Sequence, residues 1–106
     1  MEDFLARATA EDFRPRLGAR FSLEGAPGPD LPVGVLTLSE VQTRSDVRPH
    51  VRGGRTPFGL IFRGPVVPVL PQATYRLADE QLGVMALFLV PIGRDHDAVR
   101  YEAIFT

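Results

Sequence analysis

Hydrophobic and polar residues alternate over most of the chain with the period of two that is typical of β-strands. Within residues 74–77, for example, Tyr75 and Leu77 fall on one face and Thr74 and Arg76 on the other. Runs of this kind are separated by proline, glycine and aspartate, which favour turns. The pattern predicts six strands, at residues 20–23, 33–42, 58–63, 74–77, 83–92 and 99–105.

The run at residues 83–92 differs from the others because it is apolar on both faces. Met85 and Leu87 alternate with Val84 and Phe88. A strand of this composition is expected to be buried on both sides. We therefore predict that it is the central strand, and that the following run pairs with it.

Helical spacing is confined to the N-terminal segment, residues 1–17, where Phe4 and Ala8 are one turn apart. Thr9 and Asp12 fit a capping box for a further turn. The rest of the pattern predicts an all-β fold, a single small antiparallel barrel or sandwich of about six strands with a short N-terminal helix.

Composition agrees with one globular domain over residues 1–106. The chain has 44% hydrophobic and 24% charged residues, which is enough to build a core of this size. It has no cysteine, so disulfides and thiolate metal sites are excluded.

Charge is nearly balanced, with a formal net charge of -1. Such a balance gives no field that would attract nucleic acid or an anionic membrane, so neither is an expected partner. The first residues lack the basic and apolar segments of a secretory signal, and no run is long enough to span a membrane as a helix. We expect a cytoplasmic protein, with incorporation into a larger assembly left open.

Two proline- and glycine-rich stretches, residues 24–32 and 44–57, are predicted loops. The second contains a basic cluster, which consists of Arg44, Arg48, Arg52 and Arg55. These arginines are the candidate surface for binding a phosphate backbone or an acidic partner, because guanidinium groups bind phosphates and carboxylates in a planar, two-bond geometry. An ordinary solvated loop would have the same composition.

The motif Asp95-His96-Asp97 offers oxygen and nitrogen ligands in consecutive positions. A metal site here would need a further ligand, and His50 is the only other histidine. Consecutive side chains of an extended chain point in alternate directions, so the three do not converge without a special loop. A solvated turn explains the same residues.

Aromatic residues of the predicted strands are Phe58, Phe62, Phe88, Tyr101 and Phe105. They could line a ligand pocket inside a barrel, but we interpret them as core, which aromatic residues at alternating positions commonly fill. Gln72, next to Pro71, is interpreted as a buried amide that holds its loop. We predict no cofactor.

Several motifs resemble a family of small uncharacterised bacterial proteins. They are Thr9-Asp12-Phe13, Gly18 and Phe21, PF.L.FRG (57–64), LPQ.TYRL (70–77), LG (82–83), LFLVPIG (87–93) and RYEAIF (100–105). The resemblance implies a fold type and a gene-neighbourhood link to proteins with phage-tail-collar-like domains. Ala73 stands where members of such a family are expected to have glycine.

Two functional hypotheses follow. The first is a non-enzymatic interaction or assembly protein, accessory to a tail-like or fibre-like system, that binds a tail-collar-like or fibre protein through the arginine loop or an exposed sheet edge. The alternative is a small metal-binding or hydrolytic domain that uses Asp95, His96 and Asp97. The sequence favours the non-enzymatic role and leaves self-association open.

Overall fold

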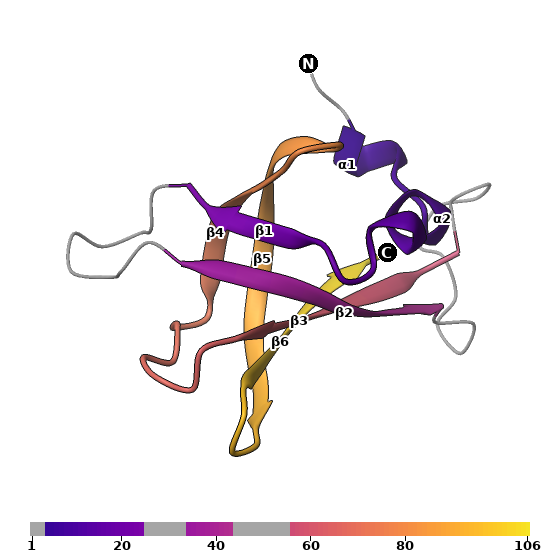
Figure 1. Cartoon of the computed structure of the whole chain (residues 1–106). Helices are drawn as coiled ribbons and strands as arrows, with labels where there is room; N and C mark the ends of the chain where they lie inside the picture. Colours follow the sequence, from indigo (N-terminus) through magenta and orange to yellow (C-terminus); the bar gives the residue numbers. More distant parts are fainter. Residues whose placement is uncertain (1–3, 25–33, 44–55) are drawn as a thin grey trace.

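Six antiparallel strands form a closed barrel in the computed structural model, which describes residues 4–24, 34–43 and 56–106 (Figure 1). The strands are β1 (Arg20–Leu23), β2 (Val35–Thr43), β3 (Phe58–Gly64), β4 (Ala73–Asp79), β5 (Gly83–Arg94) and β6 (Val99–Phe105). Their order around the barrel is β1-β2-β3-β6-β5-β4. The predicted all-β class is confirmed, and the barrel is the correct one of the two predicted architectures.

The N-terminal segment forms three single turns, α1 (Phe4–Arg7), α2 (Ala10–Phe13) and η1 (Arg14–Arg16). Thr9 and Asp12 form the predicted capping box, in which the Asp12 carboxylate accepts the Thr9 N–H at 2.9 Å. The helices are short because Pro15 and Gly18 follow closely.

Strand alternation places one side of each strand in the barrel interior. Tyr75 and Leu77 of β4 are buried, whereas Thr74 and Arg76 are exposed. In β2 the register shifts between Leu38 and Glu40, and this β-bulge directs Leu38 and Val41 to the same side although they are three residues apart.

One end of the barrel is covered by α2. The fully buried ring of Phe13 lies 5.9 Å from Phe58 and 5.7 Å from Phe105, measured between ring centroids. Phe58 and Phe105 stack on each other at 4.4 Å. This aromatic cluster joins the helical segment to the first residue of β3 and the last residue of β6.

The loop between β3 and β4 is held at the other end by two tyrosine hydroxyls. The Tyr101 hydroxyl accepts the N–H of Leu70 at 2.8 Å, and the Tyr75 hydroxyl donates to the carbonyl of Pro71 at 2.5 Å. Burial raises the pKa of Tyr75, which keeps this donor protonated. The interpretation of Gln72 as a buried amide is wrong, because Gln72 is exposed.

The prediction that residues 83–92 are buried on both faces is also wrong. Val84 is 52% exposed and Phe88 is 51% exposed. Barrel closure gives β5 the neighbours β4 and β6 but turns only one of its faces inward. The predicted pairing of β5 with β6 is confirmed.

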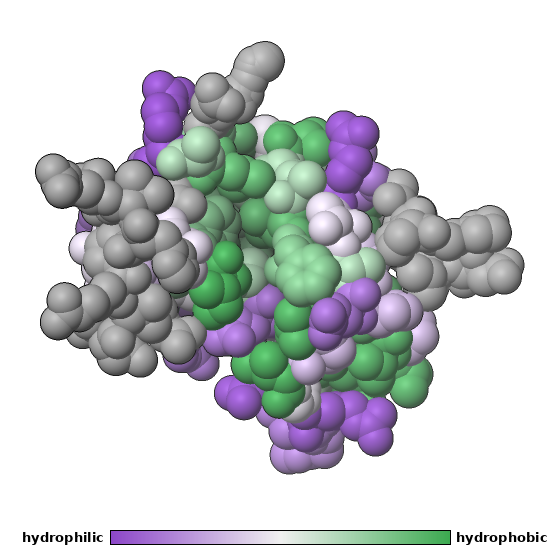
Figure 2. Space-filling view, turned by 180° about the vertical axis from the view of Figure 1, so that it is seen from behind, coloured by the Kyte–Doolittle hydropathy of each residue, from purple (hydrophilic) through white to green (hydrophobic). Residues whose placement is uncertain are grey.

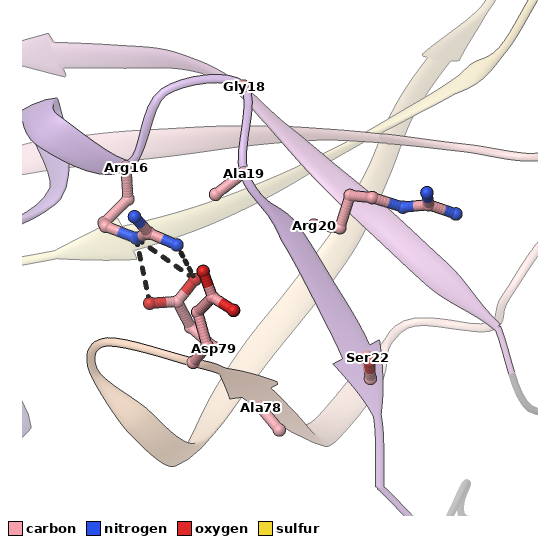
Figure 3. Close-up of a pocket in the computed structure, with 8 residues that line it drawn as sticks. Arg16, Gly18, Ala19, Arg20, Ser22, Ala78 and Asp79 are labelled. Atoms are coloured by element: carbon pink, nitrogen blue, oxygen red, sulfur yellow. Dashed lines mark hydrogen bonds and ion pairs between the residues drawn. The ribbon is translucent and has the colours of Figure 1, made fainter.

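Closure of the barrel depends on a short seam between β1 and β4. Among the described residues, Ser22↔Ala78 and Leu23↔Leu77 pair across it, and the Glu24 N–H donates to the Arg76 carbonyl at 2.7 Å. Beyond these pairs, the Arg16 guanidinium binds both carboxylate oxygens of Asp79, at 2.9–3.2 Å (Figure 3). The seam is therefore extended by an ion pair between η1 and the end of β4.

Asp79 also shapes the β4–β5 turn. Its fully buried carboxylate accepts the N–H groups of Gln81 at 3.0 Å and Leu82 at 2.9 Å. Gly83, which pairs with Asp79, has a φ of 84°, a conformation that glycine adopts without strain. Burial raises the pKa of Asp79, but Arg16 and the two N–H groups outweigh this effect, so the pKa is lowered.

We expect Asp79→Ala to lower the free energy of unfolding at pH 7 by roughly 1–3 kcal/mol, the usual cost of leaving buried donors without an acceptor. Because the folded-state pKa lies below the unfolded value of 3.8, the contribution of Asp79 is present above pH 3.8. It is lost as the pH falls through the folded-state pKa. Urea denaturation measures the free energy of unfolding of both proteins across this pH range, and the two values should converge as the pH falls. Glu80→Ala, in the same turn, is the matched control, and parallel pH profiles would contradict this role of Asp79.

Candidate functional site

The Asp95-His96-Asp97 motif lies at the tip of the β5–β6 hairpin, which projects from the barrel (Figure 1). One carboxylate oxygen of Asp95 accepts the N–H groups of Asp97 at 2.8 Å and Ala98 at 2.9 Å. These bonds make Asp95 the residue that closes the turn. They also lower its pKa, because they stabilise the ionised carboxylate.

The other two residues of this motif point into solvent. The His96 side chain is 91% exposed, and its Nε2 atom lies 3.4 Å from a carboxylate oxygen of Asp97. The structure contains no group of three or more potential metal-ligating side chains within the described residues. The turn hydrogen bonds and an ion pair with Arg63, at 3.7 Å, account for Asp95. Within the described part of the chain, His96 has no further ligand.

The other candidate residues from the sequence lie outside the described residues. They are His50 and the basic cluster Arg44, Arg48, Arg52 and Arg55. The arginine cluster remains a prediction. The proposed docking edge of the sheet is not available in the described strands, because each strand of the closed barrel has two neighbours.

A cleft of about 530 Å³ lies at the seam between β1 and β4. Its lining includes Arg16, Arg20, Ser22, Asp79 and Glu80. The Asp79 carboxylate is already occupied by Arg16 and two backbone N–H groups. In Figure 3 the Arg20 guanidinium extends away from this ion pair. Among the described residues no histidine lines the cleft, so none of them places an imidazole base beside Ser22. The cleft is a consequence of barrel closure.

The outer wall of β5 and β6 is the remaining candidate. We define the outer wall as Val84, Ala86 and Phe88 of β5 with Ile104 of β6, all of which are exposed. Ile104 is 47% exposed, similar to the valine and phenylalanine of β5. Figure 2, seen from behind, shows apolar side chains gathered over the middle of this side of the barrel.

The strand register explains how the outer wall is bounded. On its β4 side, Thr74 pairs with Phe88 and Arg76 with Ala86, so a cation lies beside the apolar residues. On its β6 side, Glu102 pairs with Val90 and lies between Arg100 and Ile104 on the same face. The guanidinium groups of Arg76 and Arg100 form neither an ion pair nor a hydrogen bond within the described ranges. The outer wall is therefore an apolar surface with the cation Arg76 at its β4 margin and with Glu102 and Arg100 at its β6 margin.

Part of this site was visible in the sequence and was misinterpreted. The signal for the outer wall in the sequence is the presence of apolar residues on both faces of residues 83–92, a pattern that also predicts a strand buried on both sides. Of the five aromatic residues assigned to the core, Phe58, Phe62, Tyr101 and Phe105 are buried as predicted, whereas Phe88 is not. Hydrophobic periodicity identifies an apolar face but does not show whether a second layer covers it.

None of the helices in the described ranges has both the length and the apolar character needed to cross a membrane.

We predict that Asp95→Ala lowers the melting temperature, because two backbone N–H groups lose their acceptor. His96→Ala, the matched neighbour, should leave the melting temperature unchanged, since His96 supports no described structure. Differential scanning fluorimetry with and without zinc chloride measures both effects. A zinc-dependent rise in melting temperature that disappears in His96→Ala would instead establish the metal-site alternative.

Comparison with known proteins identifies a family but no activity. No curated protein and no solved structure matches the chain significantly. A family described as "Domain of unknown function (DUF6916)" matches residues 8–105. This match includes all six strands and most of the helical segment. The chain therefore belongs to the DUF6916 family, whose function is unknown.

Proposed function

We propose that this protein is a non-enzymatic interaction or assembly protein that binds a protein partner through the outer wall. The observation that carries the proposal is the exposure of Val84, Phe88 and Ile104 on two neighbouring strands. Single exposed apolar residues are normal on protein surfaces, whereas a group on one face indicates an interaction site.

The physical basis is the free energy of removing apolar area from water. Each Å² of buried apolar surface contributes roughly 25 cal/mol. Aromatic residues are enriched in interfaces because they bury a large area with few rotatable bonds. Phe88, half exposed between polar Thr74 on β4 and Ile104 on the other side of β5, is the expected anchor residue.

Charge favours a different protein over a second copy of this chain. Arg76 pairs with the wall residue Ala86, and its guanidinium forms no ion pair or hydrogen bond within the described residues. A two-fold dimer through this wall would bring the arginines of both copies into one interface, whereas a partner with carboxylates around an apolar centre would neutralise them. We propose a component of a tail-like or fibre-like assembly as the first partner to test, because the family resemblance implies that class.

We expect the triple variant Val84→Ser, Phe88→Ser, Ile104→Ser to fold normally and to bind the partner at least tenfold more weakly. The reason is that an interface anchor commonly contributes 2 kcal/mol or more. The partner is obtained by affinity capture from the native host with mass spectrometry, and its affinity is then measured with purified components. Val67→Ser, an exposed valine of the β3–β4 loop, is the matched control.

A second experiment distinguishes an interface on the outer wall from one on the arginine-rich loop of residues 44–57. Joint replacement of Arg48, Arg52 and Arg55 by serine should leave binding largely unchanged if the outer wall carries the interface. Loss of binding in the arginine variant, with full binding by the wall variant, would reject the outer wall and move the interface to the loop.

A further inference from the structure

We propose that a groove between α1 and β5 receives one apolar side chain of the partner, from a segment that carries carboxylates beside that side chain. The α1–β5 groove has a volume of about 300 Å³. Its lining consists of Phe4, Leu5, Ala6, Leu82, Val84, Met85 and Ala86. The inference rests on the proposed function, because Val84 and Ala86 belong to both the groove and the outer wall.

The lining determines what the groove accepts. All the lining residues are apolar, so a polar group placed there would lose its hydrogen bonds to water. The volume is at the lower limit of the range of about 300–1,000 Å³ for ligand pockets, which suits a single side chain better than a cofactor. Buried Met85 lies in this lining, and its flexible thioether adapts to the shape of an inserted group. Leucine, methionine and phenylalanine fit these conditions.

The groove and the outer wall form one continuous apolar surface. Val84 and Ala86 line the groove, and Phe88 follows on the same exposed face of β5. A partner segment with one side chain in the groove is therefore positioned to continue along β5 towards Phe88. Interfaces of this kind are commonly anchored by a buried side chain in a pocket that is surrounded by further apolar contacts.

Two arginines next to lining residues of the groove determine the charge that is favoured in the partner segment. Arg76 is opposite Ala86 in the β4–β5 register, and Arg7 ends α1. Neither guanidinium has a hydrogen bond or ion pair in the described part of the chain. Glu80, in the β4–β5 turn, lines the seam cleft, and its charge acts on Arg16. Carboxylates that flank the anchor side chain are therefore favoured over ammonium groups.

Fluorescein-labelled peptides with a central phenylalanine between glutamates test this inference in the full-length protein. Two matched control peptides are used. In one the phenylalanine is replaced by serine, and in the other the glutamates are replaced by lysines. By fluorescence anisotropy, the first peptide should bind at least tenfold more tightly than either of the others, and its affinity should fall with added salt. Equal affinities for the three peptides, or no binding of the first up to about 1 mM, would overturn the inference.

Two variants locate the binding. Ala86→Arg places a bulky cation in the groove and should weaken peptide binding at least tenfold, whereas Val67→Arg, its control on the β3–β4 loop, should not. Arg76→Glu should shift the preference from the glutamate peptide towards the lysine peptide. Unchanged binding by Ala86→Arg would place the peptide elsewhere and overturn the groove assignment.

The same variants separate this inference from the proposed function. If the natural partner is lost by the triple wall variant but retained by Ala86→Arg, the outer wall stands and the groove inference fails. If the triple wall variant also retains the partner, the proposed function fails. A wild-type dimer in light scattering that Ala86→Arg dissociates would identify the occupant as a second copy and reject the acidic segment.

Discussion

Barrel closure is the constraint on which the rest of the structure depends. Six strands hydrogen-bond in a ring, and among the described residues the ring is completed at the β1–β4 seam by two residue pairs and one further backbone hydrogen bond. The ion pair of Arg16 with Asp79 extends that seam into the N-terminal segment. The carboxylate binds the β4–β5 turn as well, so one buried side chain connects the end of β4 and the turn that follows it with the N-terminal segment, 63 positions away.

Closure also determines which apolar residues are buried in the barrel interior and which are exposed on its outer side. The interior is filled by one side of each strand and is covered at its ends by Phe13 and by the tyrosine-held loop at Leu70. These residues are committed to packing, which is the main source of stability in a chain without disulfides. The apolar residues left on the outer side of β5 have no such role. Their exposure costs solvation free energy, and a partner would recover it.

The proposed interaction role rests on the outer wall, the groove and the arginines that form no ion pair among the described residues. Apolar area supplies affinity, while the positions of Arg76 and Arg7 select the charge of the partner. In contrast, the acidic residues of the candidate sites have structural roles. Asp95 holds a hairpin turn, and Asp79 holds the seam.

The amino-acid sequence by itself determined the all-β class, the six strands and the helical start, because alternation, turn residues and capping act between near neighbours. It also placed Tyr75 and Leu77 inside and Thr74 and Arg76 outside. It did not determine the role of Phe88, the exposure of Gln72 or the pairing of Arg16 with Asp79, which are 63 positions apart. These depend on which strands become neighbours and on which face a second layer covers, and only the tertiary structure decides both.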